Sequence, residues 1–130
     1  MLPTVARLKI DDEFEVVSSD TTILDAARII RDMGIPDLVV LEGENILGII
    51  SDYEITVNVV AEGLNPSKTR VRDAMYAIQP IDLHTSVEKA HQILQEHNIP
   101  IVPVAEHGKL LGVVTITDCW SLIAESQSKK

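Results

Sequence analysis

The sequence predicts a mixed α/β fold, of the α+β kind, built from two β-α-β-β-α repeats packed with pseudo-two-fold symmetry. The main observation is an internal repeat: an offset of 64 residues aligns the chain with itself without a gap. Under this offset Ile35-Pro36 matches Ile99-Pro100, and Leu47-Gly48 matches Leu111-Gly112. The second observation is that helical and strand spacing of apolar residues follow each other in the same order in both copies.

The sequence of the first copy predicts its strands and helices in order. Glu15 to Val17 is a short strand, and Thr22 lies where a helix N-cap belongs, because its hydroxyl can accept an unpaired backbone N–H. Apolar residues then recur at helical spacing until Pro36, which ends helical geometry just before it. A hairpin and a second helix complete the copy, with a strand at 38–41, a turn at 42–45, a strand at 46–50 and a helix at 53–62.

The second copy predicts the same series. A strand is expected from Ile78 to Ile81, and Ser86 is the expected N-cap of the following helix. The remaining elements are strands at 101–105 and 110–114, a turn at 106–109 and a helix at 118–126. Breaker residues mark a linker near 63–70. We therefore divide the chain into a first repeat, residues 1–64, and a second repeat, residues 65–130.

Composition and charge exclude several classes of protein. The 130 residues are 45% hydrophobic and 24% charged, as in ordinary globular proteins. The sequence has no run of 18 apolar residues, so no membrane span is expected. No secretion signal is expected at the N-terminus. A single cysteine, Cys119, cannot form an internal disulfide, which fits the cytoplasm. The net charge of −9 disfavours binding to nucleic acid.

Hydroxyl and carboxylate side chains follow the second hairpin strand in both copies. Thr115, Thr117 and Asp118 follow it in the second copy, and Ser51-Asp52-Tyr53-Glu54 in the first. One carboxylate can accept hydrogen bonds from two neighbouring ribose hydroxyls, and hydroxyls at a helix start suit a phosphate. An apolar slot between β-branched strand ends suits an adenine ring. The alternative is that Asp118 and Thr117, like Ser51 and Asp52, only cap helices.

The repeated motif resembles a CBS domain (named for cystathionine β-synthase), and two in tandem resemble the CBS-pair module. The motif is a hydrophobic residue and proline before one strand, and Gly-hydrophobic-hydrophobic-(Ser/Thr)-x-x-Asp at the end of the next. The run Val71-Arg72-Asp73-Ala74-Met75 is similar to the opening segment of many CBS repeats. The resemblance covers about Val5 to Ser126. It implies a stand-alone regulatory module that binds AMP, ADP, ATP, S-adenosylmethionine or methylthioadenosine, and forms a flat homodimer.

The resemblance also implies which residues line two ligand clefts. In the first cleft, Asp118 is completed by the opening strand of the first copy, by Met33 and by His97, which matches a position facing the phosphates in some CBS proteins. The candidates for this cleft are Phe14, Glu15, Val16, Met33, His97, Pro100, Thr115, Ile116, Thr117 and Asp118. The candidates for the second cleft are Ser51, Tyr53, Glu54, Ile78 and Gln79. It ranks lower because Glu54 replaces the aspartate of the family, and its extra methylene is expected to move the carboxylate outward by about 1.5 Å.

Several candidates also have simpler interpretations. His97 ends a predicted helix, where the helix dipole favours an imidazolium without any ligand. Met33 is expected more often in a core than in a pocket. Cys119 is expected to be a small buried hydrophobe, and Trp120 to face the core or a dimer partner. Four basic residues are additional candidates for phosphate contacts: Arg70, Arg72, Lys89 and Lys109.

We expect a cytoplasmic sensor that binds an adenosine-containing ligand and signals to an unidentified protein by a population shift. One alternative is a binder of S-adenosylmethionine or methylthioadenosine, since the first cleft has few cations apart from His97. Another is a ligand-free dimerisation or scaffold module. No enzyme is expected, because GxSxG, HExxH, GxxxxGK[ST] and CxxC are missing. No required cofactor is expected, and no metal site, because the four histidines and one cysteine lack ligand spacing.

Overall fold

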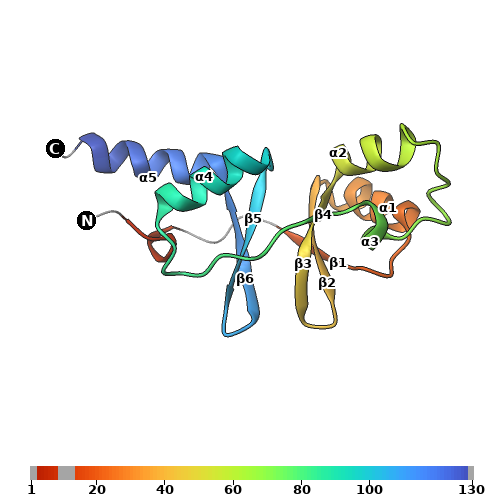
Figure 1. Ribbon diagram of the computed structural model, residues 1–130, viewed down its shortest axis with the longest axis horizontal. Helices are drawn as coiled ribbons and strands as arrows, with labels where there is room; N and C mark the ends of the chain where they lie inside the picture. The colour runs from red at the N-terminus through yellow and green to blue at the C-terminus, as the bar shows by residue number, and fades with distance from the viewer. Residues whose placement is uncertain (1–2, 9–13, 129–130) are drawn as a thin grey trace. The chain divides into compact units, whose positions relative to one another are not determined.

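The computed structural model describes residues 3–8 and 14–128, with side chains as far as residue 124. It contains helices and strands in two compact units (Figure 1). Residues 14–79 are termed the first-repeat unit, and residues 3–8 together with 80–128 are termed the second-repeat unit. The predicted mixed α/β fold is confirmed.

The first-repeat unit is built on a four-stranded sheet with the order β1-β2-β3-β4. Its elements are β1 (Glu15–Ser18), α1 (Ile23–Met33), β2 (Asp37–Glu42), β3 (Asn45–Ser51), α2 (Asp52–Ile55), a π-helical segment (Thr56–Val60), α3 (Val71–Ala74) and β4 (Tyr76–Ala77). Strand β1 is parallel to β2, whereas β2, β3 and β4 are antiparallel neighbours. The apolar face of α1, with Ile23 and Ala26, joins a buried cluster that includes Leu38 and Ile50 of the sheet.

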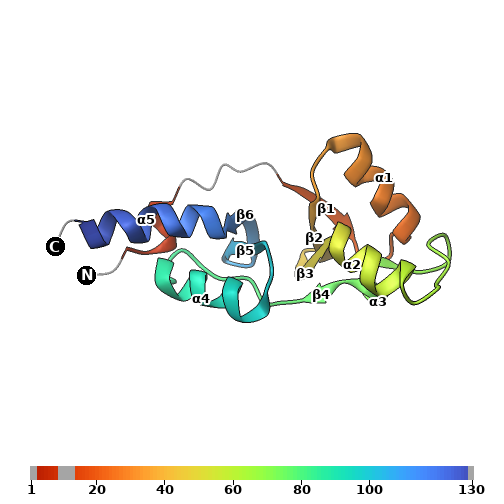
Figure 2. The same ribbon diagram turned by 90° about the horizontal axis from the view of Figure 1, so that it is seen from above.

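The second-repeat unit repeats the hairpin and both helices. Its elements are a 3-10 turn (Val5–Arg7), α4 (Val87–His97), β5 (Ile101–Glu106), β6 (Lys109–Thr115) and α5 (Ile116–Ser128). Helices α4 and α5 contact each other, and Figure 2 shows them side by side in a second view. The predicted strand at 78–81 is wrong, because only Ile81 bridges to Val104, in parallel. Pro80 interrupts this segment, since proline lacks the N–H that a ladder needs.

Both long helices begin and end as their sequences require. The hydroxyl of Thr22 accepts from the Asp25 N–H at 3.2 Å, and that of Ser86 accepts from the Lys89 N–H at 3.0 Å. Both predicted N-caps are therefore confirmed. The left-handed residue that ends each helix is Gly34 (φ 69°) in the first copy and Asn98 (φ 51°) in the second, the residue types that adopt this conformation most readily.

The opening segments are exchanged between the repeats. The Val71 N–H donates to the Thr21 carbonyl at 2.8 Å, so residues from the start of the second repeat complete the first-repeat unit. Equivalently, the Val5 N–H donates to the Thr85 carbonyl at 2.8 Å in the second-repeat unit. Both valines are 0% exposed. The compact units therefore divide between residues 79 and 80, whereas the repeat in the sequence divides at residues 64 and 65.

The second helix of the first repeat departs from a regular α-helix. The prediction of one helix over 53–62 is only partly correct, because α2 passes into the π-helical segment, where the Ala61 N–H donates to the Thr56 carbonyl at 2.8 Å. In the second repeat, α5 is a regular helix of 13 residues. Among the residues that the structure describes, no helix is both long and apolar enough to cross a membrane.

Candidate functional site

The main candidate site lies where β6 passes into α5. Thr115 is the last residue of β6, and the Asp118 N–H donates to its Oγ1 at 3.2 Å. In return, the Thr115 N–H donates to Oδ2 of Asp118 at 3.1 Å. This reciprocal pair is a capping box with Thr115 at the N-cap. Asp118 therefore takes part in capping, as the alternative interpretation expected, but from the third helical position. Neither Asp118 nor Thr117 is the N-cap, because the chain is still extended at Thr115 and helical from Ile116.

The capping box uses only half of the Asp118 carboxyl. Its Oδ1 accepts no hydrogen bond from the described part of the chain, and the side chain is partly exposed. Thr117 is exposed and Ile116 is partly exposed beside it. Ile101 pairs with Thr115, which brings the neighbouring Pro100 to the same end of the hairpin. Five predicted residues therefore come together here: Pro100, Thr115, Ile116, Thr117 and Asp118.

The other candidates for this cleft come from other elements of the chain. His97 is the last residue of α4 and is exposed. Glu15 and Val16 are in β1, Phe14 precedes them, and Met33 ends α1 with 52% of its surface exposed. These last four residues belong to the first-repeat unit. Their contribution to a cleft around Asp118 stays a prediction.

In the first copy the equivalent carboxyl is directed inward. Oε1 of Glu54 accepts both from the Ser51 N–H at 2.8 Å and from the Ser51 hydroxyl at 2.7 Å. The Tyr53 N–H donates to the Ser51 hydroxyl at 3.2 Å. Glu54 is only 7% exposed, so the expectation that its extra methylene moves the carboxylate outward is wrong. The longer side chain instead folds back onto its own cap.

The remaining candidates for the second cleft are separated from this cap along the sheet. Strand β4 pairs with β3 through Gly48 and Ala77, and the Ile78 N–H donates to the Leu47 carbonyl at 3.3 Å. Ile78 is thus four residues along β3 from Ser51, roughly 13 Å at the rise of an antiparallel strand. Gln79 follows Ile78 and is exposed, whereas Tyr53 is 64% exposed beside the cap. The structure does not bring Ile78 and Gln79 together with Ser51 and Glu54.

Asp37 is a charged neighbour of the first cap that the sequence analysis missed. It pairs with Ser51 at the end of the sheet and is half-buried. Burial, then repulsion from Asp52 and from Glu54, raises the pKa of Asp37 above its usual value. The 64-residue offset gave a signal, since the position equivalent to Asp37 is the apolar Ile101. The first copy therefore concentrates negative charge where the second copy has an apolar residue.

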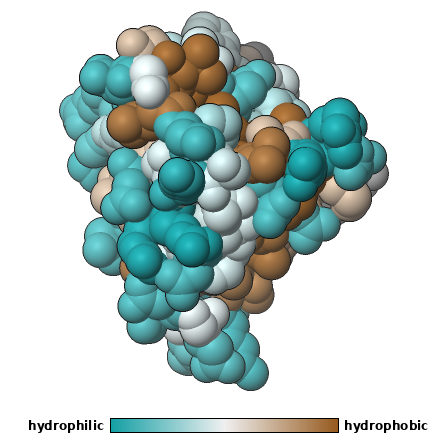
Figure 3. Space-filling model, turned by 90° about the vertical axis from the view of Figure 1, so that its right-hand side faces the viewer, coloured by the Kyte–Doolittle hydropathy of each residue, from teal (hydrophilic) through white to brown (hydrophobic). Residues whose placement is uncertain are grey.

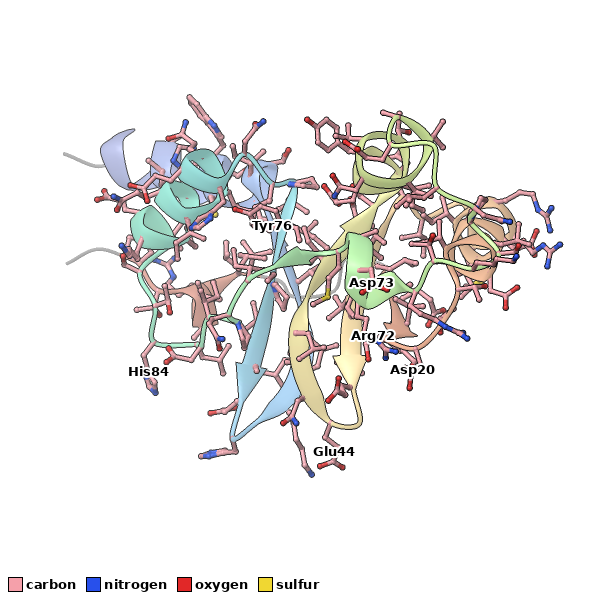
Figure 4. All side chains as sticks on the ribbon, turned by 45° about the vertical axis from the view of Figure 1, so that its right-hand side comes forward. Asp20, Glu44, Arg72, Asp73, Tyr76 and His84 are labelled. Atoms are coloured by element: carbon pink, nitrogen blue, oxygen red, sulfur yellow. The ribbon has the colours of Figure 1, made fainter. Side chains whose placement is uncertain are left out.

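The basic candidates do not gather at either cap. Arg70 donates to the Asp20 carbonyl at 2.9 Å, and Arg72 forms an ion pair with the Asp20 carboxylate, as Figure 4 shows. Lys89 is in the first turn of α4, and Lys109 begins β6 at the end opposite Thr115.

Cys119 follows the site directly and is buried, as expected. Burial and the neighbouring Asp118 raise the pKa of its thiol to about 11. Because the thiolate is the reactive form, this cysteine is chemically inert near neutral pH. Within the described residues, no group of three or more His, Cys, Asp or Glu side chains is placed to hold a metal ion.

A family comparison agrees with this geometry. The model of the CBS domain matches residues 5–60 and 71–119. The chain belongs to the CBS-domain family. CBS domains are commonly regulatory, ligand-binding modules, and stand-alone CBS-domain proteins are typically regulatory rather than catalytic.

Curated relatives of this CBS-domain chain come from bacteria, archaea and plants. Hypoxic response protein 1 of Mycobacterium tuberculosis is 27% identical over 120 residues, which cover 88% of this chain and 82% of that protein. An uncharacterized protein of Methanopyrus kandleri is 29% identical over 104 residues. This match covers 78% of the chain but only 53% of that protein's length. CBSCBSPB2 of Arabidopsis thaliana is 30% identical over 120 residues, which cover 89% of this chain and 22% of that protein.

Solved structures show the same fold. Hypoxic Response Protein I, whose crystal structure holds two coordinated zinc ions, has a TM-score of 0.78 at 24% identity, covering 96% of this chain and 99% of that one. A CBS-domain protein of Thermoplasma acidophilum has a TM-score of 0.77 at 23% identity, covering 100% and 79%. The hexameric CBS-CP12 protein of bloom-forming cyanobacteria has a TM-score of 0.77 at 20% identity, covering 100% and 77%. At these identities the likeness concerns the fold alone.

Proposed function

We propose that this chain is a cytoplasmic regulatory module that binds AMP, ADP or ATP beside Asp118 and signals to a partner protein. Its membership of the CBS-domain family supports a regulatory, ligand-binding role. The observation that carries the choice of site is the state of Asp118. Its Oδ2 is held by the Thr115 N–H, while Oδ1 accepts no hydrogen bond from the described residues.

A carboxylate that is fixed through one oxygen is well prepared for a ribose. Its orientation is set before binding, so the free oxygen can accept hydrogen bonds from ribose hydroxyls without loss of rotamer freedom. The exposed hydroxyl of Thr117 and the first N–H groups of α5 suit a phosphate. Pro100 and Ile116 offer apolar surface for the adenine ring. In this proposal Phe14, Glu15, Val16, Met33 and His97 complete the cleft.

The first copy is the weaker candidate for a second site. Glu54 is buried and both of its hydrogen bonds go to Ser51, so it offers less to a ribose than Asp118 does. Asp37 and Asp52 add negative charge beside it, which opposes a phosphate. We therefore propose one main site per chain, in the second copy.

The test is thermal unfolding against AMP, ADP, ATP, S-adenosylmethionine and methylthioadenosine. A ligand that binds only the native state raises the melting temperature with its concentration. The key variant is Asp118→Asn, because the amide oxygen can keep the bond from the Thr115 N–H while the charge is lost. Ser86→Ala is the matched control, since it removes an N-cap of the same unit, at a cost of about 1 kcal/mol, far from Asp118 in the sequence.

The expected result is a rise in melting temperature with one or more of AMP, ADP and ATP. Asp118→Asn is expected to weaken the apparent affinity for that ligand at least tenfold, and Ser86→Ala is expected to leave it unchanged. A hydrogen bond to a charged group contributes about 1.5 to 3 kcal/mol, and the loss of that free energy corresponds to at least a tenfold weaker affinity. A response only to S-adenosylmethionine or methylthioadenosine would replace the proposed ligand. A flat panel would favour the ligand-free scaffold.

We also propose that the module is a homodimer that contacts its second copy through a stripe on the first-repeat unit. Tyr53, Val57 and Val60 are 64%, 39% and 65% exposed and follow each other at about one turn. Figure 3 shows apolar surface near the top of this end of the molecule. Sedimentation equilibrium is expected to give a dimer for the wild type and a monomer for Val60→Asp. A monomeric wild type would contradict the proposal.

A further inference from the structure

A pocket of about 280 Å³ lies in the second-repeat unit, away from the proposed adenosine site. It is lined by Glu88 and His91 of α4 and by Trp120 and Ile123 of α5. Asp118 and Trp120 are two residues apart, so they face opposite sides of α5, about 200° around the helix axis. The pocket is therefore a separate feature of the molecule.

The aromatic side of the pocket is held in a defined orientation. The rings of His91 and Trp120 meet edge to face, with centroids 5.8 Å apart and planes at 84°. The indole is nevertheless 59% exposed, an unusual amount for the largest apolar side chain. Nε2 of His91 is buried and has no hydrogen-bond partner among the described residues. The pair thus presents a fixed aromatic surface to solvent.

The described lining of the pocket carries negative charge. Among the described lining residues, Glu88 is the one Asp, Glu, Lys or Arg, and Lys89, the next residue of α4, does not line the pocket. A carboxylate beside an exposed indole is the combination that attracts an organic cation, through an ion pair and a cation–π contact. The net charge of −9 favours the same partners at longer range.

We propose that this pocket binds the side chain of an arginine or lysine of a partner protein. Its volume is below the roughly 300 to 1,000 Å³ of sites that enclose small molecules, and the exposed Trp120 leaves it open. A single side-chain head group fits such a recess, and tryptophan is enriched where interfaces concentrate their binding energy. The pocket is thus a docking point for a basic surface, independent of adenosine binding.

The test uses Trp120 as its own reporter, because it is the one tryptophan of the sequence. The indole N–H signal is followed by NMR during titration with N-acetylarginine amide and N-acetyllysine amide. N-acetylcitrulline amide is the neutral control of matched shape. Glu88→Gln removes the lining carboxylate, and Glu96→Gln removes an exposed one from the same helix, outside the pocket.

The expected result is a saturable shift with both cations and none with the citrulline compound. Glu88→Gln is expected to weaken binding about two- to fivefold, the range of an exposed ion pair, and Glu96→Gln to leave it unchanged. An equal shift with citrulline, or an equal effect of both variants, would overturn the proposal. So would an indole signal that moves with protein concentration alone, since a second copy would then fill the pocket. The adenosine panel is independent of Glu88, so the two proposals fail separately.

Discussion

Asp118 and Glu54 occupy equivalent positions in the two repeats and serve their helices in the same way, but they differ in what remains for a ligand. The shorter Asp118 reaches the Thr115 N–H with one oxygen and leaves the other unused by the described residues. Glu54 has one more methylene, reaches both the N–H and the hydroxyl of Ser51, and is buried. A single carbon thus changes a candidate ligand contact into a structural one.

Asp37 leads to a prediction at the scale of the residue. Its pKa is raised in the folded protein, so the native state binds a proton more readily than the unfolded chain does. Stability is therefore lost as the pH rises from the unfolded value near 3.8 through the raised folded pKa, and the charged form stays unfavourable above it. Asp37→Asn is expected to stabilise the protein near pH 7, by less than about 1 kcal/mol because solvent screens this half-exposed group.

Urea unfolding of this variant at several pH values provides the measurement. The gain relative to the wild type is expected to shrink as the pH falls toward the unfolded value near 3.8 and to vanish well below it, where Asp37 is protonated in both states. Glu44→Gln, at the exposed tip of the β2–β3 hairpin, controls for the loss of one negative charge. A gain of the same size at pH 3 and pH 7 would show that charge is not the cause.

At the scale of the element, the sequence predicts most of the fold because its signals are local. Thr22 and Ser86 mark helix starts, and Pro36 and Pro100 mark helix ends, through chemistry that acts within a few residues. Elements that depend on partners distant in the sequence are harder to predict from it. Strand β4 forms at Tyr76 and Ala77 because they reach β3, where a Cβ on Gly48 would lie 2.1 Å from the Tyr76 carbonyl oxygen.

The candidate site was predictable to a similar extent. The residues of the Thr115 cap follow from the repeat and lie together, since they are neighbours in the chain. Pro100 joins them only through the register of β5 and β6, which the hairpin turn determines. The inward turn of Glu54 and the charge of Asp37 required the structure, because both depend on how side chains pack at the end of a sheet.

At the scale of the whole molecule, the exchanged opening segments lead to another prediction. Val5 and Val71 are each 0% exposed, and replacing either with alanine is expected to cost about 2 kcal/mol. Because Val5 packs in the second-repeat unit, Val5→Ala is expected to reduce amide hydrogen-exchange protection mainly in α4, β5 and β6. Val71→Ala is expected to reduce it mainly in α1 and β1–β3.

Val16→Ala is the matched control for these variants, since Val16 is 37% exposed and loses less on truncation. Protection that falls mainly within residues 14–79 for Val5→Ala would contradict the exchange of segments. The comparison needs no ligand and no partner, so it tests the architecture alone.

The exchange has a consequence for how the chain can be divided. The opening valine of each repeat is buried in the unit formed mainly by the other repeat, so neither repeat taken alone holds all the residues of a compact unit. Cutting the present gene at the sequence boundary therefore yields two pieces that each lack a buried valine, whereas genetic transfer of residues 3–8 to the second piece restores a closed unit.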